Sequence, residues 1–137
     1  MSSAQGIAAG VVALAAFGGA AIEATRPPEP QPPVTITRLE WDGERIIYER
    51  HAKVTTLAAW RASVLIEGKE RQVCEGDGSA TYERGAVAHA WSLATITGDP
   101  LCAEKIAPGQ EYYVLVTIAP LDGRPSASRR SGPFVLK

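Results

Sequence analysis

Apolar and polar residues alternate along much of residues 34–137, and this alternation predicts β-strands. The longest alternating run extends from position 54 to position 66, with Thr55, Arg61 and Ser63 on one side of it. Because successive side chains of a strand point to opposite faces, such a run buries one face and exposes the other. The face expected to be buried carries Val54, Thr56, Ala58, Trp60, Ala62, Val64 and Ile66.

Turn residues divide the rest of this region into short segments. Asp42-Gly43 is a hairpin signal between the expected strands 34–41 and 44–50, and turns are also expected at Gly68-Lys69 and at "EGDG", 75–78. No stretch shows a sustained helical period, so we predict an all-β fold, a single antiparallel β-sandwich. Further strands are expected at 71–74, 90–97, 101–106, 111–119 and 132–137.

One segment carries a more specific pattern. In residues 106–118 an aliphatic residue is followed by Pro108-Gly109, then by Tyr112, then by alternating apolar residues. This pattern resembles the corner before the sixth strand of fibronectin type III and related immunoglobulin-like domains. The resemblance implies an immunoglobulin-like sandwich in which the Tyr112 hydroxyl bonds back to the corner backbone. Parity places Tyr112 on the same face as Val114, Val116 and Ile118, so we expect Tyr112 and not Tyr113 to be the buried tyrosine.

The tryptophans and cysteines complete the structural residues that we single out. Trp60, on the long alternating segment, is expected to be a large core residue, and Trp91 lies between Cys74 and Cys102 in the sequence. The cysteines are too close in sequence to be the pair that joins the sheets of true immunoglobulin domains. Both stand at strand-like positions, and we expect an intrachain disulfide between them; two separate buried thiols are the alternative.

The start of the chain has a different composition. No charged residue precedes Glu23, and residues 7–22 contain only apolar residues and glycine. We expect a transmembrane helix or signal segment in residues 1–25, with a membrane anchor through 7–22; a cleaved secretion signal and a buried helix are the alternatives. Residues 26–33, "RPPEPQPP", form a proline-rich linker that favours extended polyproline II, and the sandwich domain then occupies 34–137.

Charge and reactive residues exclude several functions. The net charge is -1, which gives no basic surface for nucleic acid. The two histidines, His51 and His89, are far from any nucleophile signature, and with the cysteines they offer no close pair of metal ligands. We therefore expect no catalytic site, no metal and no cofactor, and we predict that the protein is not an enzyme.

Residues 121–132 form the one long polar segment with concentrated charge. We expect a solvated hairpin loop there and take Asp122, Arg124, Arg129 and Arg130 as candidate binding residues. The sequence thus indicates a non-enzymatic, membrane-tethered module with its domain outside the cytoplasm, binding a protein or cell-envelope component. The alternatives are a secreted protein and an accessory protein of a phage or mobile element, displayed on a particle or active in envelope disruption; small sandwiches of this kind occur in bacterial envelopes and prophages.

Overall fold

The computed structural model describes residues 29–136. Residues 31–137 form a compact unit of their own. The apolar segment 7–22 lies outside the described residues; within 29–136, no helix is long and apolar enough to cross a membrane. The elements of the described chain are β1 (Val34–Trp41), β2 (Ile46–Ala52), β3 (Thr56–Ile66), β4 (Arg71–Tyr82), β5 (Gly85–Trp91), α1 (Leu93–Thr97), η2 (Cys102–Lys105), β6 (Glu111–Pro120), β7 (Ala127–Arg130) and β8 (Phe134–Val135).

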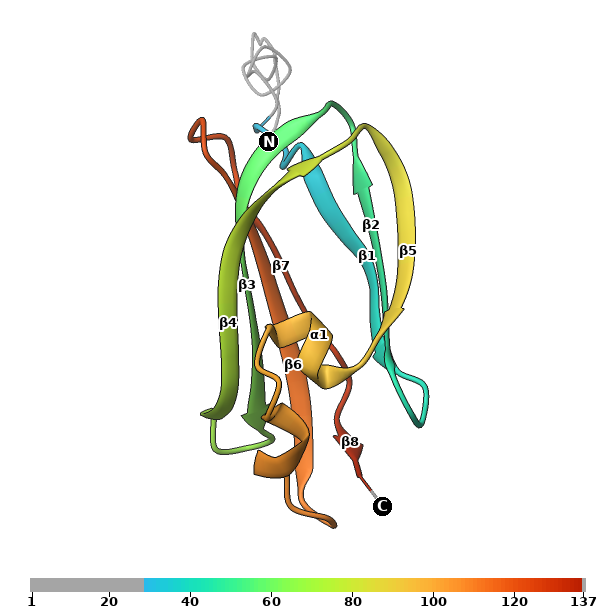
Figure 1. The fold of residues 1–137 in the computed structure, drawn as a ribbon. Coiled ribbons are helices and arrows are strands. Elements are labelled where there is room, and N and C mark those ends of the chain that lie inside the picture. The colour runs from blue at the N-terminus through green and yellow to red at the C-terminus, as the bar shows by residue number, and fades with distance from the viewer. Residues whose placement is uncertain (1–28, 137) are drawn as a thin grey trace, which may run out of the picture. The chain divides into compact units, whose positions relative to one another are not determined.

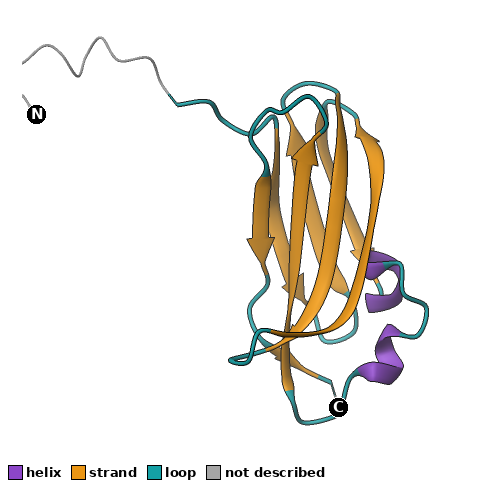
Figure 2. Cartoon of the chain, turned by 90° about the vertical axis from the view of Figure 1, so that its left-hand side faces the viewer, coloured by secondary structure: helices purple, strands orange, loops and turns teal. Residues whose placement is uncertain are grey.

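The strands form two antiparallel sheets that pack face to face, as a β-sandwich does (Figure 1). One sheet has the order β1-β2-β5, and the other has the order β4-β3-β6-β7, with β8 paired to β6. Figure 2 shows the strands running along the long direction of the unit, with both helices toward one end. The sequence therefore predicted the mostly-β class and the antiparallel pairing correctly.

The first hairpin shows how local sequence sets the start of the fold. The Asp42 carboxylate accepts hydrogen bonds from the backbone N–H groups of Glu44 and Arg45, at 2.8 and 2.7 Å, and Gly43 adopts a φ of 106°. The turn is longer than the two-residue hairpin that we expected, so β2 begins only at Ile46. An irregularity in β1 between Ile36 and Arg38 adds one residue, and the burial of β1 changes parity there.

The core lies between the two sheets, where the alternation placed it. Side chains of β3 at positions 56, 58, 62 and 64 are buried, whereas Val54 lies before the strand and is 46% exposed. In β6 the predicted parity holds for Tyr112, Val114, Val116 and Ile118. The buried apolar residues that meet between the sheets include Val34, Ile36, Leu39, Ile46, Tyr48, Ala52, Ala58, Ala62, Val64, Val114, Val116 and Ile118.

Two segments predicted as strands are helical. The segment 90–97 leaves β5 at Trp91 and continues as α1, because Ser92 Oγ accepts a hydrogen bond from the Thr95 N–H at 3.1 Å and Gly98 ends the helix with a φ of 73°. The segment 101–106 forms η2 instead of a strand. Short apolar segments do not separate helix from strand by period, and this ambiguity explains both errors.

Three further features differ from the prediction. The expected turn at 75–78 is wrong, because β4 continues without interruption to Tyr82. Strand β5 was not predicted as a whole, because "GAVAHAW" consists mostly of small residues and its apolar and polar residues hardly alternate. Part of the expected loop 121–132 is strand β7.

The two sides of the sandwich differ. On one side β1 and β7 lie against each other, and Arg129 Nη1 donates to the Ile36 carbonyl at 3.4 Å. On the other side β4 and β5 are the end strands of their sheets. Figure 1 shows these two strands separating below the loop that joins them, with α1 near their far ends. One side of the sandwich is therefore closed by strand packing, whereas β4 and β5 on the other side are not packed against each other in this way.

Candidate binding cleft

A cleft of about 260 Å³ opens between the sheets on the side of β4 and β5. Strands β2 and β5 form one wall, β3 and β4 form the other, and α1 contributes Thr95 and Ile96. Five of the residues that line it carry aromatic or imidazole rings. The full lining is Tyr48, Arg50, Trp60, Ala62, Ala80, Thr81, Tyr82, His89, Trp91, Thr95, Ile96 and Val116.

Three rings from β2 and β5 lie nearly parallel along the first wall. Register pairs Tyr48 with His89 and Ile46 with Trp91, so all these side chains share the inner face of the sheet. The ring centroids of Tyr48 and Trp91 are 5.1 Å apart and those of His89 and Trp91 are 4.5 Å apart, with interplanar angles of 15° and 13°. Tyr48 is buried whereas His89 is exposed, so the cluster extends from the core to the cleft opening.

The opposite wall depends on two glycines of β4. A Cβ atom at Gly78 would lie 3.0 Å from the indole of Trp60, and one at Gly76 would lie 1.4 Å from the carbonyl oxygen of Thr97. The absence of side chains at these positions lets Trp60 lie across β4 and lets α1 approach the sheet. Trp60 is thus half-buried at the cleft and packs against the core, on the inner face that the alternation predicted.

Arg50 provides the positive charge of the cleft. It is 8% exposed, and its Nη1 donates to the carbonyl oxygens of Glu83 and Gly85 at 2.7 and 3.1 Å. Its guanidinium carbon lies 5.5 Å from the centroid of the Tyr82 ring. Burial raises the pKa of both Tyr48 and Tyr82 above the ordinary tyrosine value, and Arg50 partly opposes this rise. Both phenols are therefore neutral near pH 7, and the charge of Arg50 is not compensated by them.

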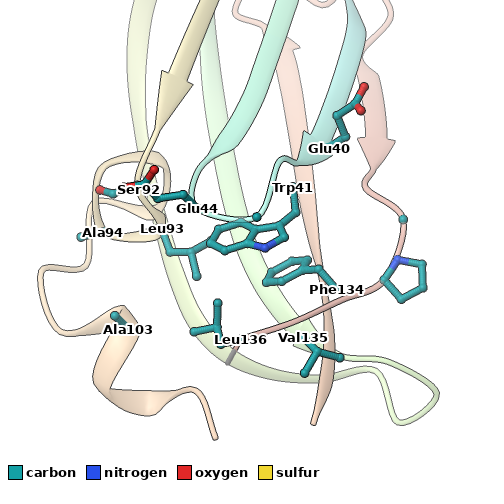
Figure 3. A pocket seen from close by; sticks show the side chains of 13 residues that line it. Glu40, Trp41, Glu44, Ser92, Leu93, Ala94, Ala103, Phe134, Val135 and Leu136 are labelled. Carbon is teal, nitrogen blue, oxygen red and sulfur yellow. The ribbon is translucent and has the colours of Figure 1, made fainter. Parts of the chain in front are cut away.

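A second, wider hollow of about 820 Å³ lies near the C-terminal residues (Figure 3). Trp41 and Phe134 stack in it with centroids 4.8 Å apart, and Leu93 and Leu136 point toward them. Two carboxylates lie at its rim: Glu40 accepts a hydrogen bond from Arg38 Nε at 2.5 Å, and Glu44 is exposed. This hollow offers apolar surface and exposed carboxylates, but within residues 29–136 its lining contains no buried charged group.

The four candidate residues of the 121–132 segment do not form one site. Asp122 and Arg124 pair with each other at 2.7 Å in the turn after β6. Arg129 and Arg130 are neighbours on β7, and alternate side chains of a strand point to opposite faces. Arg130 bonds to the Glu67 carboxylate and lies 3.6 Å from the centroid of the Tyr113 ring. Tyr113 is consequently buried as well, which we did not expect.

The structural residues are brought together as the sequence suggested. Cys74 and Cys102 are joined by a disulfide with a Cα–Cα distance of 5.5 Å. The Tyr112 hydroxyl accepts a hydrogen bond from the Ala107 N–H at 2.9 Å, and Gly109 in the Pro108-Gly109 turn has a φ of 85°. Trp91 joins the cleft wall through its stack on Tyr48.

Sequence reasoning missed Tyr48, Arg50, Tyr82 and the role of His89. The sequence did contain a signal for Tyr48 and Arg50. Alternation that starts at the buried Ile46 places positions 48 and 50 on the inner face of β2. An arginine at an inward position of a strand indicates a special environment. Within residues 29–136 no three His, Cys, Asp or Glu side chains are close enough to hold a metal ion. Neither the scan against protein-family models nor the search of curated proteins found a match to this chain.

Proposed function

We propose that this chain is a non-enzymatic binding module, tethered to a membrane with its sandwich on the extracytoplasmic side, and that it binds its partner in the cleft between β4 and β5. The observation that carries the proposal is the cleft itself. It combines aromatic rings with one arginine, and the chain's own side chains leave about 260 Å³ of it unfilled. Apolar pockets with a few placed polar groups are the usual form of a binding site.

The tether and the compartment rest on other features. Residues 7–22 are apolar, residues 26–33 contain five prolines, and a stiff extended spacer suits a domain held away from a membrane. The Cys74–Cys102 disulfide favours an oxidising compartment. We also propose that the sandwich is immunoglobulin-like, of the fibronectin type III kind, because the Tyr112 hydroxyl bonds to the corner backbone in the manner of that family.

Reporter fusions test the tether. With alkaline phosphatase or green fluorescent protein at the C-terminus of the full-length chain, we expect phosphatase activity and no fluorescence in the membrane fraction. Fluorescence without phosphatase activity would refute the extracytoplasmic assignment. Recovery of a soluble form that has lost the residues before the linker would make the protein secreted and would remove the tether.

A pair of matched variants tests the cleft. Ala80 lies on the inner face of β4 and lines the cleft, whereas its neighbour Ser79 lies on the outer face. We expect the wild-type chain to co-purify an envelope component from the membranes of its native cells, Ala80→Glu to lose it, and Ser79→Glu to retain it. Loss with Ser79→Glu and not with Ala80→Glu would place the binding surface elsewhere.

A further inference from the structure

Strand β4 presents a long free edge beside the cleft. It is the end strand of its sheet, and residues 77–81 are exposed along it. The unpaired backbone groups of such an edge are a template for another strand, and proteins usually protect them with charged side chains, proline or a covering segment. From Gly78 to Tyr82 the strand has no charged residue and no proline. This part of the edge is therefore chemically suited to pair with an extended chain.

The side chains of β4 direct an added strand toward the cleft. Its inner positions near the cleft are Gly78 and Ala80, which pair with Trp60 and Ala58 of β3. Because these side chains are absent or small, alternate side chains of a strand lying beside β4 have room to enter between the sheets. The polar side chains lining the cleft are few, and a strand satisfies its backbone groups by pairing with the edge instead of with side chains.

Arg50 specifies the charge of one entering side chain. Its side-chain hydrogen bonds to residues 29–136 all use Nη1, and no ion pair in the same residues includes it. The other two nitrogens, Nε and Nη2, have no hydrogen-bond partner in this part of the chain. Because no buried side-chain nitrogen or oxygen there lacks a partner, these two atoms are not buried, and they contact solvent at the cleft that Arg50 lines. The Glu83 carboxylate does not approach Arg50 as an ion pair; it accepts from the Thr55 hydroxyl at 3.3 Å. The free N–H groups of Nε and Nη2, beside aromatic rings, are suited to a carboxylate.

We infer that β4 accepts an extended peptide strand from a partner protein, and that this strand places an Asp or Glu side chain against Arg50 between apolar residues. The inference rests on the proposed binding function of the cleft and names the chemistry of its ligand. A second copy of the chain is a poorer occupant. If two copies paired through β4 with their inner faces on the same side, Glu75 and Asp77 would stay on the outer face, away from Arg50.

A random 12-residue peptide library displayed on phage, selected on the full-length wild-type chain, tests this inference. We expect enriched clones to alternate apolar and polar residues and to carry an Asp or Glu. We expect their synthetic peptides to lose at least tenfold in affinity when that residue is changed to Asn or Gln. They should bind Ser79→Glu as they bind wild type and fail to bind Ala80→Glu, whose melting temperature and disulfide are checked first.

Hydrogen exchange with a selected peptide then distinguishes strand pairing from side-chain binding. Backbone N–H groups of β4 that face the open edge should exchange at least tenfold more slowly in the complex. Absence of enriched acidic clones, unchanged β4 exchange, or self-association through β4 would each overturn the inference. Two outcomes would refute the strand inference and leave the binding function standing. In the first, Ala80→Glu loses the co-purified envelope component but the library yields no acidic alternating clone. In the second, the co-purified component is a glycan.

Discussion

The hydrogen bond at the Tyr112 corner gives a prediction whose size follows from the structure. Tyr112→Phe removes the oxygen that accepts the Ala107 N–H at 2.9 Å and leaves the ring, which is 2% exposed, in place. Orphaning one partner of a hydrogen bond costs about 1–3 kcal/mol. Ala107 itself is exposed, so water can reach its N–H and the cost should fall near the lower end, about 1 kcal/mol.

Tyr113→Phe is the matched control. Tyr113 is also buried, at 6% exposure, but no hydrogen bond of its hydroxyl occurs in the described chain, and a phenylalanine ring keeps the contact with the Arg130 guanidinium. We expect urea unfolding at pH 7 to show a clear loss of unfolding free energy for Tyr112→Phe and a change within about 0.5 kcal/mol for Tyr113→Phe. Equal losses, or a greater loss for Tyr113→Phe, would refute the corner assignment.

Three further predictions concern stability. Replacing Cys74 and Cys102 together by serine should reduce the unfolding free energy by roughly 3–4 kcal/mol, which is the chain-entropy value for a loop of this length. An unchanged unfolding free energy would mean that the disulfide is not formed in the protein. Gly78→Ala should cost about 1–3 kcal/mol by crowding Trp60, and Gly76→Ala should cost more because a backbone carbonyl must move, whereas Gly132→Ala, which meets nothing, is the control. The pKa of Asp99 is lowered, first by the hydrogen bond from Lys105 and then by that from the Leu101 N–H. The ionised carboxylate therefore stabilises the fold at pH values above the ordinary aspartate pKa. This contribution is lost as the pH falls through the lowered pKa. The difference in unfolding free energy between wild type and Asp99→Asn should therefore be constant above about pH 5 and should shrink below about pH 4; a difference independent of pH would contradict it.

The fold was predictable wherever alternation was strong. The long run on β3 and the segment after Pro108-Gly109 have apolar residues at every second position, and both strands follow the predicted parity. The wrong predictions, at 75–78, 85–91, 92–97 and 101–106, share a cause. Small residues and short apolar segments show no clear hydrophobic period that would separate strand, helix and turn. In β4 we interpreted Gly76 and Gly78 as part of a turn. In the structure they lie where Thr97 and Trp60 approach the strand closely, and only the tertiary structure reveals this approach.

The candidate site could be predicted less well than the fold. The cleft is made by residues from β2, β3, β4 and β5 together with α1, and no local pattern reports that two end strands separate. Attention went to 121–132 because its charges are close in sequence. In the folded chain those charges are divided between a turn and the two faces of β7, and their partners are Asp122, Glu67 and the backbone of Ile36.

Site-specific photo-crosslinking in cells tests most directly whether the cleft is the binding surface. A benzophenone amino acid is placed in the full-length chain at Thr95 of α1 in the cleft lining, at Arg124 in the polar turn, or at Val135 at the wider hollow; all three positions are exposed. The account predicts one discrete adduct at Thr95, lost when Ala80→Glu is added, and no adduct at the other two positions. A discrete adduct at Arg124 or Val135 with none at Thr95 would contradict it.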